Sequence, residues 1–101
     1  MSNAMPSVLV HAEKNTYKLG DSVIITIIAK AEGQPAPHVP LKLYVFDPTG
    51  KKVFQSSLHT NINGKAMANY QLKKTLPTGN YYLEAQNKNR SVALSSFIVL
   101  Q

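Results

Sequence analysis

The stretch that decides the fold, residues 76–85, reads Leu-Pro-Thr-Gly-Asn-Tyr-Tyr-Leu-Glu-Ala, a Pro-x-Gly turn followed at once by an alternating strand. Proline and glycine supply the fixed and the positive φ angles that tight turns need. A tyrosine at the start of the next strand is typical of the corner at which a two-sheet sandwich pins its chain. We therefore predict a structural corner at Pro77, Gly79 and Tyr81, with Tyr81 and every second residue after it facing the core.

The rest of the chain supplies strands for such a corner. Residues 22–30 are rich in β-branched side chains, which favours a strand over a helix. Residues 17–22 are interpreted as a polar turn, and residues 32–40, with three prolines, as a connection or an edge. These patterns predict an all-β, seven-stranded, antiparallel sandwich of the immunoglobulin or fibronectin III kind. The predicted strands are 7–12, 22–30, 41–47, 52–58, 65–72, 81–85 and 91–100.

The chain length of 101 residues suits one domain. Residues 1–4 resemble an expression scar ahead of Met5, so we expect a single domain over residues 5–101. Cysteine is absent, which excludes disulfides, thiolate metal sites and a cysteine nucleophile. No apolar run approaches the roughly 18 residues that a membrane-spanning helix needs, so no membrane insertion is expected.

The net charge of +6 comes from 11 basic and 5 acidic residues. The basic residues are spread along the chain, and all but one are lysine, which lacks the forked geometry that reads phosphate and guanine. We interpret the excess as a solvated basic surface and expect no nucleic acid. An anionic polymer or a partner protein is the alternative interpretation.

No constellation of residues predicts catalysis or metal binding. His11, His38 and His59 lie on different segments, without the spacing of metal ligands. Asp21 and Asp47 sit in turns, where their oxygens bond nearby backbone amides. No Gly-x-Ser-x-Gly elbow occurs. We therefore predict no catalytic, cofactor-binding or metal-binding residues, and no enzyme.

Four apolar residues are predicted to face outward. Alternation places Val23, Ile25 and Ile27 inside, so Ile24 and Ile28 point away from the core. The same reasoning turns Tyr44 and Phe46 outward, and we predict that these four form one patch on the outer side of a sheet. Because monomers seldom expose large contiguous apolar patches, it is a candidate for contact with a neighbouring domain or a partner. The alternatives are a slipped register or scattered exposed residues.

Five short motifs occur along the chain in a definite order and spacing. They are Tyr17-x-x-Gly20-Asp21-x-Val23, Val39-Pro40-Leu41 with Asp47-Pro48-x-Gly50, Thr60-Asn61-x-x-Gly64-x-Ala66, Leu76-Pro77-x-Gly79-x-Tyr81, and Ser96-Phe97-x-Val99. In this order and spacing the set resembles the second macroglobulin domain (MG2) of the α2-macroglobulin and complement-like proteins, including the bacterial ones. The resemblance covers about residues 7–100.

The resemblance implies a non-catalytic scaffold and protein–protein contact module of a larger extracytoplasmic protein, periplasmic or at the cell surface. Some family members trap proteases through a bait segment and a thioester. The thioester needs a cysteine, which this chain lacks, and no bait-like insertion is visible. The alternative is a stand-alone or accessory module that recognises carbohydrate or another surface polymer. The sequence leaves the parent protein, the partner and the oligomeric state open.

Overall fold

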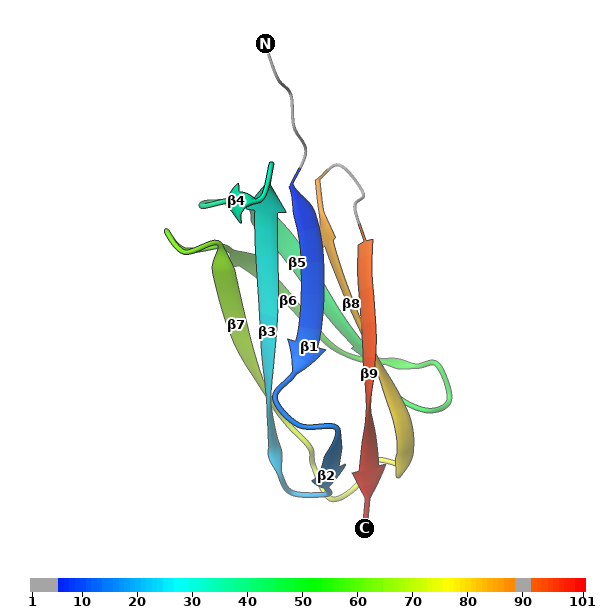
Figure 1. The fold of residues 1–101 in the computed structure, drawn as a ribbon. Helices are drawn as coiled ribbons and strands as arrows, with labels where there is room; N and C mark the ends of the chain where they lie inside the picture. The colour runs from blue at the N-terminus through cyan, green and yellow to red at the C-terminus, as the bar shows by residue number, and fades with distance from the viewer. Residues whose placement is uncertain (1–5, 89–91) are drawn as a thin grey trace.

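The computed structural model describes residues 6–88 and 92–101, which form two β-sheets packed face to face with no helix among them (Figure 1). The predicted expression scar, residues 1–4, lies outside the described residues. So does Ser91, the first residue of the last predicted strand. The strands are β1 (Ser7–Ala12), β2 (Thr16–Lys18), β3 (Ser22–Ala31), β4 (Gln34–Pro35), β5 (Pro40–Phe46), β6 (Lys52–His59), β7 (Lys65–Gln71), β8 (Gly79–Asn87) and β9 (Val92–Leu100).

The first sheet is built around β3, the longest strand. β1 pairs with it antiparallel from Ser7 opposite Lys30. β7 also pairs with β3, from Ser22 opposite Gln71, and the short β4 pairs with the end of β3. This sheet therefore presents β1, β3 and β7 side by side on one face of the molecule (Figure 1).

The second sheet has the order β2-β9-β8-β5-β6. All its pairs are antiparallel except β2 with β9, which are parallel, with Thr16 opposite Ile98 and Lys18 opposite Leu100. The first part of the chain thus crosses between sheets, because β1 belongs to one sheet and β2 to the other.

The predicted all-β sandwich is confirmed, with a different strand count. Each of the seven predicted strands is present within two residues of its predicted bounds. The described residues add two further strands, β2 and β4, in segments interpreted as a turn and a connection. Both are too short for alternation to show. The prediction that all strands pair antiparallel is wrong for β2, which pairs with β9 in parallel. The two strands lie some 80 residues apart, and no local sequence pattern indicates such a pairing.

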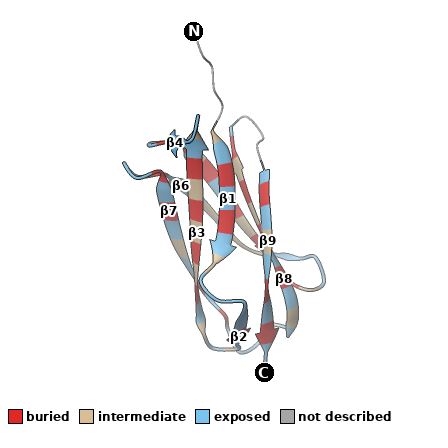
Figure 2. Cartoon of the chain, viewed as in Figure 1, coloured by how far each residue is buried: buried red, intermediate tan, exposed pale blue. Residues whose placement is uncertain are grey.

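The core lies between the sheets and follows the predicted alternation. Every second residue of β3 from Val23 to Ala29 is fully buried, as are Leu43 and Val45 of β5. Figure 2 shows buried positions alternating with intermediate ones along β3 and mostly with exposed ones along β9. Tyr17 and Tyr81 enclose Phe97, with ring centroids 5.4 Å apart in both pairs. The aromatic pairs therefore join β2, β9 and β8 within the second sheet.

Candidate interaction surfaces

The predicted corner is held by one hydrogen bond and one close contact. The Tyr81 hydroxyl donates to the carbonyl of Pro77 at 2.6 Å. Gly79 has φ +129°, and a Cβ at that position would lie 3.0 Å from Cγ of Pro48. The corner therefore packs against the Asp47-Pro48 turn, so two of the motifs seen in the sequence meet in space. Burial raises the pKa of Tyr81 to about 12.

The turn after β6 is built around Thr60 and Gly64. The buried Thr60 hydroxyl donates to the carbonyl of Ala36 at 2.6 Å and accepts from the amide of Val39 at 2.8 Å. Gly64 has φ +74°, and a Cβ there would lie 2.7 Å from the carbonyl oxygen of Ala29. The Gly64 carbonyl accepts from the Ala29 amide at 2.8 Å. This turn thus ties the proline-rich connection to both sheets.

Asp47 organises the turn between β5 and β6. Its Oδ1 accepts hydrogen bonds from the amide and hydroxyl of Thr49, at 2.8 and 2.6 Å, and from the amide of Lys51 at 3.0 Å. The Thr49 hydroxyl is the largest cause that lowers the pKa of Asp47 from its ordinary value of 3.8, followed among the lowering causes by these two amides. The carboxylate therefore has a structural explanation within its own turn.

The histidine and carboxylate side chains of the described residues are dispersed over the fold. Within residues 6–88 and 92–101, no group of three or more His, Asp or Glu side chains is placed to hold a metal ion. The same residues include no helix that is long and apolar enough to cross a membrane. His11, His38 and His59 lie on β1, in the connection before β5 and at the end of β6.

The four residues of the predicted patch are not brought together. Ile24 and Ile28 lie on β3 of the first sheet, and Tyr44 and Phe46 on β5 of the second. All four are half-buried on outward positions, so the predicted faces are right. The two pairs point to opposite sides of the sandwich, because the connection between β3 and β5 crosses from one sheet to the other. Alternation fixes the face of a strand, but not the sheet to which it belongs.

Each pair has its own surroundings. Ile28 lies directly opposite Leu9, and Met67 opposite Thr26, so the outer face of the first sheet carries exposed apolar side chains. On the second sheet, the ring centroids of Tyr44 and Phe46 lie 6.4 Å apart, and the Lys52 ammonium lies 5.1 Å from the Tyr44 ring centroid.

The largest concentration of exposed apolar side chains lies elsewhere, on the outer side of β8 and β9. Leu94 is 73% exposed, and its neighbours on this face are each close to half exposed. We call this surface the β8–β9 apolar face; its members are Tyr82, Val92, Leu94, Ile98 and Leu100. The sequence carries a signal for this face, since β9 is apolar at most of its inward and most of its outward positions.

The edge of β9 beside this face is only partly paired. β2 pairs with β9 only at Ile98–Leu100, and from Val92 to Phe97 no strand among the described residues forms a ladder with this edge, although β1 of the first sheet lies beside β9 (Figure 1). Natural edge strands usually carry charges or proline that discourage pairing with another chain. β9 has neither in its nine residues. An uncharged, open edge next to an apolar face is typical of a surface that another protein segment covers.

Comparison with known proteins places these features in a family. The family model described as the MG2 domain matches residues 7–99. A search of the curated proteins finds no match.

Solved structures share the fold. The native form of Escherichia coli α2-macroglobulin superposes with a TM-score of 0.84 at 20% identity, over 98% of this chain and 6% of that one. A Salmonella α2-macroglobulin superposes with a TM-score of 0.84 at 22% identity, over 99% of this chain and 7% of that one. The Yersinia pseudotuberculosis adhesin InvE gives 0.70 at 15% identity, over 97% and 33%. The chain thus spans less than a tenth of the α2-macroglobulins that it matches.

Proposed function

This chain belongs to the MG2 domain family, and from that membership we propose that it is a non-catalytic scaffold and protein–protein contact module of a larger extracytoplasmic protein of the α2-macroglobulin kind. The observation that carries the proposal is the match of the MG2 model over residues 7–99, nearly the whole described chain. The proposed unit is a single domain over residues 5–101. Its role is to space and contact its neighbours, without bait or thioester chemistry of its own.

The length of the matched structures supports a place within a longer chain. This domain equals 6% and 7% of the two α2-macroglobulins and 33% of the adhesin. Domains within one chain bury surfaces that resemble transient protein interfaces. A module in such a chain therefore has at least one face that a neighbour covers.

We assign that contact to the β8–β9 apolar face. Of the eight large apolar residues that are exposed among residues 6–88 and 92–101, five belong to it. Its only charged neighbour on β8 is Glu84, opposite Leu94. The proposed occupant is an adjacent domain of the same long chain, which would bury the face and cover the open edge of β9. Ile24 with Ile28, and Tyr44 with Phe46, are then two smaller candidate contacts on separate faces.

The test of the scaffold role is the native state of the protein that contains this domain. An antibody raised against the purified chain would be used to probe fractions of the source cells. We expect a band far larger than the 11.1 kDa of this chain, in the periplasmic or surface fraction. A band near 11 kDa, or one confined to the cytoplasm, would overturn the proposal.

A further inference from the structure

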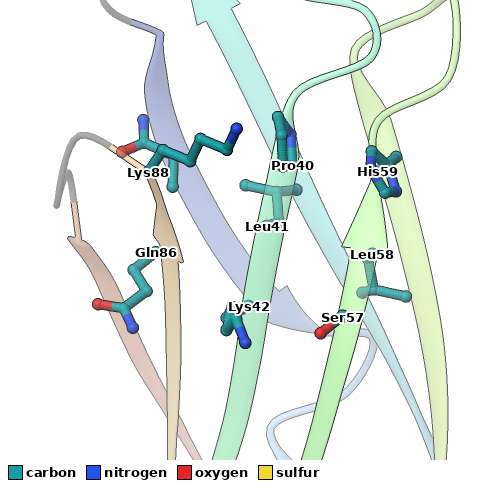
Figure 3. A pocket seen from close by; sticks show the side chains of 9 residues that line it. Pro40, Leu41, Lys42, Ser57, Leu58, His59, Gln86 and Lys88 are labelled. Atoms are coloured by element: carbon teal, nitrogen blue, oxygen red, sulfur yellow. The ribbon is translucent and has the colours of Figure 1, made fainter.

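A shallow hollow of about 310 Å³ lies on the outer face of the second sheet, at the end where β5 begins and β6 and β8 finish (Figure 3). This volume is at the lower end of the range for ligand-binding pockets. The hollow differs from the β8–β9 apolar face because two lysines and a histidine stand among its lining residues, although most of the surface that lines it is apolar. The described residues that line it are Pro40, Leu41, Lys42, Ser57, Leu58, His59, Gln86, Asn87 and Lys88.

The three basic side chains that line the hollow come from β5, from β6 and from the residue that follows β8. Lys42 lies on β5 directly opposite Ser57 of β6 and Gln86 of β8. His59 lies one row further on, and Lys88 follows the end of β8. Figure 3 shows the Lys88 side chain extending from β8 toward Pro40, with Lys42 in the next row. Side chains in directly opposed and diagonal positions of neighbouring strands lie within about 5 to 8 Å at their Cβ atoms.

The charge of the hollow is not balanced by the described residues that line it. None of them is a carboxylate. The nearest acidic residue on these strands is Glu84, which lies opposite Tyr44 and diagonal to Lys42, and which lines the adjoining hollow. Lys42, Lys88 and His59 are all exposed, so their charged or polar ends are free to meet a ligand from solvent. Local charge therefore favours an anionic occupant.

We propose that this hollow is a docking site for an acidic segment of a partner protein, in which two or more Asp or Glu residues lie close together. Each lysine is a point charge with no fork for a bidentate phosphate contact. Lysines on two strands therefore match separate carboxylates better than a single compact anion. Ser57 and Gln86 add a hydroxyl and an amide that bond peptide groups or carboxylate oxygens between those charges.

An acidic sugar polymer fits the hollow less well. Sugar rings are held by exposed aromatic faces, and no aromatic side chain lines this hollow. The nearest candidate, Tyr44, already has the Lys52 ammonium at 5.1 Å from its ring centroid and Phe46 beside it. An acidic sugar would match the basic charge of the hollow but would find no aromatic ring there to stack on. An acidic peptide needs only the charge, so it is the favoured occupant.

This site goes beyond the scaffold role and does not depend on it. It uses β5, β6 and β8 at one end of the sheet, whereas the proposed domain contact uses the outward side chains of β9 and Tyr82. Loss of peptide binding would leave the scaffold proposal standing. A parent protein of unexpected size would leave the peptide site testable on this chain alone.

The experiment titrates the ¹⁵N-labelled chain with capped tetraglutamate and follows amide chemical shifts. We expect saturable shifts centred on Lys42, Ser57 and Gln86, weakening as NaCl rises from about 50 to about 300 mM. Lys42→Gln should weaken binding by about two- to fivefold, and the double variant Lys42→Gln, Lys88→Gln by about tenfold, because exposed ion pairs are individually weak. Lys30→Gln is the matched control, an exposed strand lysine on the opposite sheet.

Three outcomes would overturn the proposal. The first is the absence of saturable shifts with wild type at low salt. The second is unchanged affinity in the double variant, or an equal loss in the Lys30→Gln control. The third is tighter binding of oligogalacturonate than of tetraglutamate at the same residues, which would make the occupant an acidic sugar. Thermal unfolding of each variant checks that its fold is intact, and no large change is expected at these exposed positions.

Discussion

Single residues fix the corners of this sandwich, and Tyr81 is the clearest case. Its ring is fully buried while its hydroxyl bonds the Pro77 carbonyl four residues earlier. Tyr81→Phe should lower the free energy of unfolding by about 1 kcal/mol, because it deletes one hydrogen bond and keeps the ring. Urea denaturation of the two proteins measures the difference, and an unchanged midpoint would mean that the corner does not depend on this bond.

The raised pKa of Tyr81 adds a pH dependence at the same residue. Its folded pKa of about 12 lies above the ordinary value of 10.0. The associated stability is thus fully present below pH 10 and is lost as the pH rises through 10 toward 12. The free energy of unfolding of Tyr81→Phe should therefore fall less steeply, as the pH rises from 10 toward 12, than that of wild type does.

Gly64 offers a test of close packing at a turn. Gly64→Ala meets both a positive φ and a Cβ only 2.7 Å from the Ala29 carbonyl oxygen. Gly33 is a matched control, since it also has a positive φ but has nothing within 4 Å of the Cβ position. We expect Gly64→Ala to cost about 1 to 3 kcal/mol more than Gly33→Ala, from strain at the contact. Equal melting temperatures of the two variants would show that the turn at Gly64 accommodates the added methyl group without strain.

Asp47 governs the response of its turn to acid. The carboxylate accepts three hydrogen bonds, and its folded pKa lies below 3.8. It therefore contributes stability above about pH 4 that is lost as the pH falls through the folded pKa. Asp47→Asn should flatten this acid limb of a stability–pH profile measured by urea denaturation. A profile with the same acid slope in both proteins would contradict the assignment.

At the scale of elements, alternation and turn chemistry predicted most of what the structure contains. The inward sets of β3, β5 and β8 and the corner at Pro77 and Gly79 follow from side-chain period and local φ demands, which the sequence carries directly. β2 could not be predicted, because three residues show no period and their partner is β9. The sheet in which β5 lies could not be predicted either, which is why Tyr44 and Phe46 were grouped with the isoleucines of β3.

The proposed role of β9 as a domain contact can be tested at Leu94, its most exposed apolar side chain. Leu94→Lys should change the unfolding free energy of the isolated chain by less than about 0.5 kcal/mol, because Leu94 is 73% exposed. Ile62→Lys is a matched control, since Ile62 is 72% exposed on the turn after β6. In the complete parent protein, Leu94→Lys should speed amide hydrogen exchange in β9, while Ile62→Lys should not. Equal exchange in the two variants would remove the β8–β9 apolar face as a domain contact.

At the scale of the whole molecule, the two sheets offer different surfaces to different partners. The outer side of the second sheet carries the β8–β9 apolar face along one edge and the basic hollow toward the other, and β8 contributes different residues to each. The first sheet offers Leu9, Ile24, Ile28 and Met67 on the opposite side. A module of this kind can contact a neighbouring domain through one face and hold a separate segment on another, because the faces share few side chains.

The parallel pairing of β2 with β9 also determines how the molecule carries a load. β1 begins at one pole of the sandwich and β9 ends at the other, with β1, β2 and β9 running the same way (Figure 1). Tension between the two poles therefore slides β2 along β9, so the hydrogen bonds between them are strained together and not one after another. In single-molecule pulling we expect one abrupt rupture, whereas gradual peeling from β1 would contradict this geometry. In a long chain of stacked domains, such a clamp would let the module transmit force without opening.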